Sequence, residues 1–275
     1  MTRHALVVHS RMPAFDRDSG SQDIDNTVRF LLDDGWAVTF VSQEDDTQIE
    51  ERHARRLRQL GVATYAGLTW IEKLAHSAEF DLAIVAFWEL AEKVVPILRS
   101  RSPATRIVVN SMDVHFLRHA RRAFGQHTSL DDAYGRDTAR ELTTYNMADA
   151  VIAVSDKERD LLGEFLGEAR VHTLPLAESI DRSTVPLAQR RGRFFVGNFR
   201  HLPNREAVEY LCGEVMPLLT PGLLEVHPLT VVGNHLDQVA LDVDTAIPGV
   251  NLVGWVPSVR PYVERSRLSV VPLLN

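Results

Sequence analysis

Glycine and polar residues that could hold an anionic ligand follow an apolar run at Phe195. Gly197, Asn198 and Arg200 come directly after this run, and a helical pattern begins near Asn204. Free N–H groups and the positive dipole end at the start of a helix bind phosphate, and arginine offers a forked cation to a diphosphate. This spacing favours a site for a diphosphate.

Two weaker segments of the same kind come later in the chain. Gly233 and Asn234 follow an apolar run that ends at Val232, and Gly254 follows Val253. Each glycine alone could mark only a turn, because glycine is also the ordinary turn residue. Their recurrence after successive apolar runs favours a cradle for a nucleotide or another phosphorylated ligand.

Titratable side chains gather after another apolar run, at residues 106–112. Asp113, His115 and Arg118 follow it within six residues. Asp113 could orient a hydroxyl group or take part in proton transfer, and His115 could hydrogen-bond a substrate, since histidine is the residue type used most often for this near neutral pH. The alternative is an aspartate that caps a helix with a solvated face.

Two further segments have a functional and a purely structural interpretation. In residues 16–21 (DRDSGS), Gly20 would let the backbone approach a ligand, and the serines would suit an oxyanion or a sugar hydroxyl. A plain turn with a helix cap explains the same residues. Ser155 and Glu158 have the spacing of a capping box, so structure alone accounts for them.

The elements that would position these residues alternate regularly along the chain. Apolar, strand-like runs occupy residues 4–10, 37–43, 62–67, 81–87, 106–112, 150–155 and 170–176. Helical patterns separate them, for example at residues 23–33, 49–61, 69–79, 89–103 and 156–167. Apolar strands that alternate with helices predict a parallel sheet covered on both faces.

A second alternation follows a polar segment without a clear period. Strand-like runs lie at residues 194–199, 229–234, 250–256 and 268–274, with helical patterns at 204–220 and 257–266. We therefore predict an α/β protein with two Rossmann-like domains, residues 1–176 and 193–275, joined by a linker at 177–192. Ligand-binding residues should follow the carboxyl ends of the strands.

Composition and motifs exclude several classes of protein. A formal net charge of −7 argues against nucleic-acid binding, because that binding depends on a basic surface. The sequence has neither a dinucleotide-binding GxGxxG motif nor a P-loop, and it has no run long enough to span a bilayer. The one cysteine, Cys212, lies in an apolar helical pattern, which predicts a core position and a reducing, cytoplasmic compartment.

Taken in order, these segments resemble the bacterial glycosyltransferases of family 4. Residues 195–219, 229–234 and 250–273 resemble the donor-binding half of these retaining GT-B enzymes. The RMPAFDRDSGS and MDVHFLRHARR segments resemble the branch that makes surface polysaccharides, and ELTTYNMADAVIAVSDKERDLL resembles the end of its amino-terminal domain. The resemblance covers nearly the whole chain.

The resemblance implies that a nucleotide-diphosphate sugar is the donor substrate, with no separate cofactor and no metal. It places Gly20 near the donor phosphates or the acceptor, and Asp113 and His115 at the sugar. It assigns donor binding also to the later glycine-containing loops, namely Gly197, Asn198, Arg200, Gly233 and Asn234. Residues 1–176 would form the acceptor-side domain, and the acceptor would be a glycan or a lipid-linked molecule.

The chain departs from the family pattern at two places. Many relatives carry a His-Asp pair where this chain has Met112 and Asp113, so His115 becomes the candidate imidazole. The family's glycine-rich segment with a lysine, and its paired glutamates, would follow Asn275. We therefore expect a truncated donor domain, in which an incomplete sheet favours self-association through its edge, and a fragment that is inactive by itself.

Two other functions fit the same fold. A nucleotide-sugar epimerase would release its nucleotide instead of passing the sugar to an acceptor. A non-catalytic docking or assembly module would bind a partner and turn over no nucleotide sugar. Residues 117–127 are basic and partly amphipathic, which favours either peripheral contact with the inner membrane or an ordinary solvated helix face.

Overall fold

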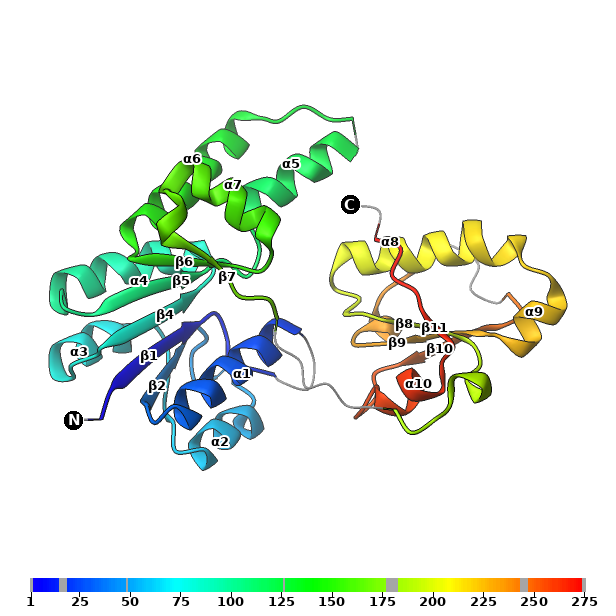
Figure 1. The fold of residues 1–275 in the computed structure, drawn as a ribbon, viewed down its shortest axis with the longest axis horizontal. Coiled ribbons are helices and arrows are strands. Elements are labelled where there is room, and N and C mark those ends of the chain that lie inside the picture. Colours follow the sequence, from blue (N-terminus) through cyan, green and yellow to red (C-terminus); the bar gives the residue numbers. More distant parts are fainter. Residues whose placement is uncertain are drawn as a thin grey trace. The chain divides into compact units, whose positions relative to one another are not determined.

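Two compact units make up the chain, Met1–Glu178 and Ser179–Asn275. The computed structural model describes residues 2–14, 19–47, 49–125, 127–176, 183–242 and 247–273. Each unit is an α/β structure with a parallel sheet (Figure 1). The predicted α/β class with two parallel sheets is therefore confirmed. The predicted linker, residues 177–192, includes residues 177–182, which lie outside the described residues.

The described part of the first unit contains a parallel sheet with the strand order β3-β2-β1-β4-β5-β6-β7. Its strands are β1 (His4–His9), β2 (Ala37–Ser42), β3 (Ala63–Ala66), β4 (Leu82–Ala86), β5 (Arg106–Asn110), β6 (Ala150–Ala153) and β7 (Val171–Thr173). The chain builds outward from β1 to β3 and then returns to β4 on the other side of β1. The order reverses between β1 and β4, and open α/β sheets bind ligands at the carboxyl ends of strands at such a point.

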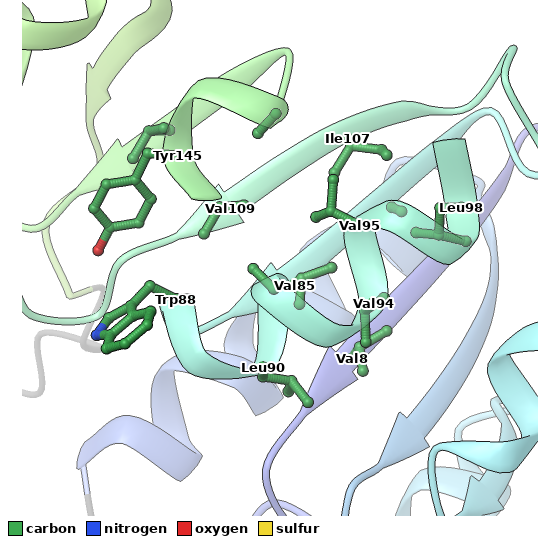
Figure 2. Packing of buried hydrophobic residues seen from close by; sticks show 14 of the residues in the cluster. Val8, Val85, Trp88, Leu90, Val94, Val95, Leu98, Ile107, Val109 and Tyr145 are labelled. Carbon is green, nitrogen blue, oxygen red and sulfur yellow. The ribbon is translucent and has the colours of Figure 1, made fainter. Parts of the chain in front are cut away.

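Helices cover both faces of this sheet (Figure 1). On one face lie α1 (Ser19–Asp33) and α2 (Glu51–Gln59); on the other lie α3 (Thr69–Ser77), α4 (Trp88–Arg101), α6 (Asp132–Met147) and α7 (Asp156–Leu166). Helix α1 buries Ile24, Val28 and Leu31, a spacing that makes one apolar stripe. Figure 2 shows Val94 and Leu98 of α4 packed over the strands. A short 3-10 turn, Glu168–Arg170, leads into β7.

Helix α5 (His115–Gly125) differs from the other helices of the first unit. Phe116 is its one buried residue, while the core helix α4 buries six of its residues. The later turns of α5 run away from the sheet (Figure 1). Its anchorage therefore depends on its first turn.

The second unit has a smaller parallel sheet in the order β10-β9-β8-β11. Its strands are β8 (Arg193–Val196), β9 (Leu229–Val232), β10 (Val250–Gly254) and β11 (Leu268–Ser269), and its helices are α8 (Leu202–Tyr210), α9 (Pro221–Val226) and α10 (Arg260–Arg265). Phe195 packs under α8, whereas Phe194, on the opposite face, stacks on Tyr262 of α10 with the ring centroids 6.5 Å apart.

Two details of the helices differ from the predicted ranges. Helix α1 begins at Ser19, four residues before the predicted start, so Gly20 lies in its first turn and not in a loop. The helix predicted at 204–220 is α8 followed by a π-helical turn, Leu211–Val215, and a 3-10 turn, Met216–Leu218. Pro217 lacks the N–H that a regular helix would need there. Two other 3-10 turns, Leu187–Gln189 and Leu236–Gln238, lie in loops.

Candidate functional site

Strained backbone marks the carboxyl ends of β4 and β5 in the first unit. Phe87 has a φ of 66° and Met112 a φ of 57°, values that side-chain-bearing residues rarely adopt. Asn110 stabilises the backbone at both residues. Its carbonyl accepts a hydrogen bond from the Phe87 N–H at 2.9 Å, and its Oδ1 accepts one from the Met112 N–H at 3.0 Å. Strain of this kind persists where surrounding contacts fix it, and it is common at ligand sites.

Asn110 also connects β5 to α1. Its Nδ2 donates to Asp23 Oδ2 at 3.3 Å, and both side chains are buried. Burial raises the pKa of the Asp23 carboxyl, and the hydrogen bond from Asn110 partly offsets that effect. This buried polar pair fixes the start of the predicted Asp113 and His115 segment against the helix that follows β1.

His115 begins α5 and is the most constrained of the predicted site residues. Its ring Nδ1 lies 2.9 Å from Glu89 Oε1 and 3.0 Å from Trp88 Nε1, both at the start of α4. Its side chain is 15% exposed. Although burial tends to raise the pKa of Glu89, hydrogen bonds from His115 and from the Glu89 backbone lower it overall, so this carboxylate stays ionised at neutral pH.

A buried carboxylate from α6 caps the start of α5. Glu141 accepts from the His115 N–H and the Phe116 N–H, each at 2.9 Å, and from the Tyr145 hydroxyl at 2.9 Å. Burial raises the pKa of Glu141, against the effect of these hydrogen bonds, and burial raises the pKa of Tyr145 well above its ordinary value. The first N–H groups of α5 are therefore occupied by protein.

His115 lines a small cavity of about 130 Å³ between the start of α4, α5 and α6. The lining residues are polar and aromatic: Trp88, Glu89, His115, Phe116, Arg118, His119, Tyr134, Asp137, Thr138 and Glu141. Asp113 is not among them; it forms an ion pair with Arg118 instead. The structure thus brings His115 into a cavity and turns Asp113 toward a cation on the first turns of α5.

Several buried polar atoms have no hydrogen-bond partner in the part of the chain that the structure describes, and two of them lie near this sheet edge. These two are the Ser111 hydroxyl, after β5, and Glu158 Oε2, on α7 after β6. Burial raises the pKa of Glu158, and the nearby charge of Asp113 adds to this effect. The predicted cap at Ser155 is confirmed, since its Oγ accepts from the Glu158 N–H at 3.3 Å. Unpaired buried polar atoms are rare in native proteins and support a ligand site at this sheet edge.

The other candidate of the first unit, Gly20, lies on α1 after β1. Residues 15–18 of its predicted loop lie outside the described residues. The described part of the chain contains no cluster of three or more His, Cys, Asp or Glu side chains arranged to hold a metal ion.

In the second unit the loops after β8 and β9 touch through their glycines. A Cβ on Gly233 would lie 1.7 Å from the Gly197 carbonyl oxygen, and a Cβ on Gly197 would lie 2.7 Å from Asn204 Cγ. Gly233 also has a φ of 151°. This backbone contact therefore requires a glycine at 233, whereas a side chain at 197 would displace the Asn204 side chain.

Backbone hydrogen bonds join the same two loops. The Gly197 N–H donates to the Val232 carbonyl at 3.1 Å, and the Phe199 N–H donates to the Asn234 carbonyl at 2.9 Å. Asn198 Oδ1 accepts from the Arg200 N–H at 3.1 Å, and the Arg200 side chain is exposed. The structure therefore places the five donor-binding candidates of the second unit at the carboxyl ends of β8 and β9: Gly197, Asn198, Arg200, Gly233 and Asn234.

Three residues that contact His115 were not predicted from the sequence: Trp88, Glu89 and Glu141. Trp88 and Glu89 directly follow a predicted strand, the place where ligand residues were expected, so their position was a usable indication. Glu141 lies inside a helix, and its contact with α5 depends on packing between residues 25 and 26 positions apart. No local pattern predicts that contact.

The sequence model of Glycosyltransferase Family 4 matches residues 22–180, more than half of the chain. The chain belongs to glycosyltransferase family 4. No curated protein matches it by sequence.

Solved structures similar to this family 4 chain are GT-B proteins of low sequence identity. UGT2 of Phytolacca americana, complexed with UDP-2-fluoro-glucose and pterostilbene, is 12% identical with a TM-score of 0.57, over 98% of this chain and 76% of that one. The lipopolysaccharide outer core galactosyltransferase WaaB is 10% identical with a TM-score of 0.56, over 97% and 73%. A Listeria monocytogenes protein described as a UDP-N-acetylglucosamine 2-epimerase is 9% identical with a TM-score of 0.56, over 98% and 74%. These similarities establish the GT-B fold.

Proposed function

We propose that this chain binds a nucleotide-diphosphate sugar and transfers its sugar, with retention, to a glycan or lipid-linked acceptor in bacterial surface-polysaccharide synthesis. Membership of family 4 supports sugar transfer in general. The donor is the substrate, and the proposed reaction uses no separate cofactor or metal.

The contact between Gly197 and Gly233 is the observation that carries this proposal. It brings two loops together at the carboxyl ends of adjacent strands with no side chain between them. The exposed guanidinium of Arg200 and the start of α8 would face the diphosphate. Charge that develops on a leaving diphosphate needs such donors, and removing one donor from an active site typically costs roughly 2.7–4 kcal/mol of transition-state stabilisation.

In the first unit, His115 would hydrogen-bond a hydroxyl group of the donor sugar, and Asp113 with Arg118 would hold the loop that carries it. Support comes from the cavity beside His115 and from the strained backbone at Phe87 and Met112. Gly20, in the first turn of α1, would leave room for the donor phosphates or the acceptor.

Calorimetric titration of UDP, GDP and dTDP into the chain tests the donor site. We expect one nucleotide to bind, and Arg200→Ala to weaken it about tenfold or more, since a hydrogen bond to a charged group contributes about 1.5–3 kcal/mol. Arg265→Ala is the matched control, because Arg265 is an exposed arginine of the same unit on α10. Equal weakening by both substitutions, or no binding by a folded sample, would contradict the proposal.

The two alternative functions predict different products. The similar Listeria structure is described as an epimerase, which makes this function one alternative. An epimerase would release free nucleotide without any acceptor. A docking module would turn over no nucleotide sugar at all. Radiolabelled UDP-sugars incubated with and without a lipid-linked glycan distinguish the three, because transfer requires label to move onto the acceptor.

Peripheral membrane contact, through α5, is a further part of the proposal. Phe124 is 88% exposed beside the exposed Arg121 and Arg122, a combination that suits an anionic bilayer surface. No described helix is both long and apolar enough to cross a bilayer.

Co-sedimentation with vesicles that contain phosphatidylglycerol tests this contact. Phe124→Ser should reduce the bound fraction several-fold, while Phe30→Ser should not, although Phe30 is 72% exposed on α1. Binding that is equal on neutral phosphatidylcholine vesicles, or that survives Phe124→Ser, would contradict a role of α5.

A further inference from the structure

Two groups compete for one atom of His115. Its Nδ1 lies within hydrogen-bond distance of the Glu89 carboxylate, at 2.9 Å, and of the Trp88 indole N–H, at 3.0 Å. An indole N–H can only donate, and an ionised carboxylate can only accept. Nδ1 can therefore satisfy one of these neighbours but not both.

Each choice gives the other ring nitrogen a different role. If Nδ1 carries the proton and donates to Glu89, the neutral ring has a bare Nε2 that accepts a hydrogen bond. If Nδ1 accepts from Trp88, the neutral ring carries its proton on Nε2, which then donates. Nε2 makes no hydrogen bond to any residue that the structure describes. The choice at Nδ1 thus decides what the ring offers a ligand.

The other charged groups around the ring are engaged elsewhere. Glu141 uses both oxygens on backbone N–H groups and Tyr145. On α5, Arg118 pairs with Asp113, and the His119 ring lies parallel to His115 at a centroid distance of 6.4 Å. On α6, Asp137 pairs with Arg140. Among the described residues, Glu89 is therefore the carboxylate that acts on the imidazole directly.

An ionised Glu89 should prevail over the indole. A charge-assisted hydrogen bond is roughly twice as strong as a neutral one, and a carboxylate facing a bare Nδ1 would be repelled by its lone pair. The lowered pKa of Glu89 keeps that carboxylate ionised at neutral pH.

We infer that Glu89 is a positioning residue that holds His115 in the Nδ1–H tautomer and so presents Nε2 as an acceptor for a sugar hydroxyl. The inference rests on the proposed function for the sugar ligand, but the tautomer can be measured without one. It implies a preference for a ligand with a hydroxyl at this place over one with a methyl ether or fluorine, since those groups cannot donate.

Long-range proton–nitrogen NMR spectra of the ¹⁵N-labelled chain test the tautomer, with His115→Asn used to identify the His115 signals. At pH 8 we expect Nδ1–H in the wild type and a shift toward Nε2–H in Glu89→Gln, because a glutamine amide can donate to Nδ1. Glu92→Gln is the matched control: Glu92 lies on the same helix but pairs with Arg140, so this substitution should leave the His115 signals unchanged. Trp88→Phe removes the competing donor and should retain Nδ1–H.

A wild-type ring protonated on Nε2, or a tautomer that Glu89→Gln leaves unchanged, would overturn the inference. A separate experiment measures sugar transfer from UDP-glucose, UDP-galactose and UDP-N-acetylglucosamine. With the substrate that is turned over, Glu89→Gln should lower kcat/KM about tenfold and alter its pH profile, whereas Glu92→Gln should do neither. If the tautomer responds as expected but no sugar nucleotide binds the wild type, the proposed function fails and the assignment of Glu89 stands.

Discussion

Glu141 is the single residue on which the first-unit site most depends. Its carboxylate accepts from two backbone N–H groups at the start of α5 and from Tyr145, all at 2.9 Å. A carboxylate is the side chain that can accept on both oxygens in this way. The position of His115 therefore follows from a residue on a different helix.

We expect Glu141→Gln to lower the free energy of unfolding by about 1–3 kcal/mol, because its amide nitrogen would face a backbone N–H and leave it unpaired. Urea unfolding followed by circular dichroism measures this. Since the folded-state pKa of Glu141 is raised, its ionisation makes wild-type stability fall as pH rises from the ordinary glutamate value to the raised one. The advantage of the wild type over Glu141→Gln should therefore be larger at pH 5 than at pH 8.

Glu164→Gln on α7 is the control, because Glu164 is exposed and a surface substitution usually changes stability by less than about 0.5 kcal/mol. An equal effect of the two substitutions, or a Glu141→Gln deficit that grows with pH, would show that Glu141 does not support α5 as described.

At the scale of elements, the second unit depends on how the loops after β8 and β9 fit together. Gly233→Ala should destabilise this unit by several kcal/mol and abolish nucleotide binding, because its Cβ would overlap the Gly197 carbonyl. Thermal unfolding and calorimetric titration with the nucleotide that binds measure the two effects. Gly222→Ala on α9 is the control, since a Cβ there meets no atom within 4 Å. A fully stable, nucleotide-binding Gly233→Ala chain would refute this account.

The positions of the strands and helices were the most predictable feature of this protein. The strands are apolar throughout and the helices carry a regular apolar stripe, so the hydrophobic pattern separates them. Helix ends were less predictable: α1 starts at Ser19 and not near Asp23, and the stretch from Leu211 to Leu218 leaves regular helix geometry. Such ends depend on local hydrogen bonds that hydrophobic periodicity does not encode.

The candidate site was predictable only in part. The rule that ligand residues follow parallel strands places His115 and the glycines of the second unit correctly at sheet ends. The contacts that define His115, from Trp88, Glu89 and Glu141, join separate helices and arise from packing. The roles of the predicted residues toward donor and acceptor stay predictions.

At the scale of the whole molecule, exposed apolar side chains gather on the outer strands of the second unit. Leu252 and Val253 on β10 are 41% and 40% exposed, and Leu268 on β11 is 56% exposed. Outer strands with unpaired backbone groups and apolar side chains favour pairing with another chain. We predict self-association through this sheet.

Sedimentation velocity over a range of concentrations measures that association. The mean mass should rise with concentration in the wild type and much less in Leu268→Lys, because a charged edge residue opposes strand pairing. Leu218→Lys is the control, since Leu218 is 83% exposed but lies in the 3-10 turn after α8. A wild type that stays monomeric, or an equal response to both lysines, would exclude pairing through β11.

The sparse anchorage of α5 has a consequence for how this protein can diversify. Its first turn is fixed by Phe116 and Glu141, while its later turns add no buried residue to the core. Substitutions in those later turns should be nearly neutral for folding, so this helix can accumulate sequence change freely during evolution. Descendants of one gene could acquire different surface preferences there while the sheet and the residues around His115 stay the same.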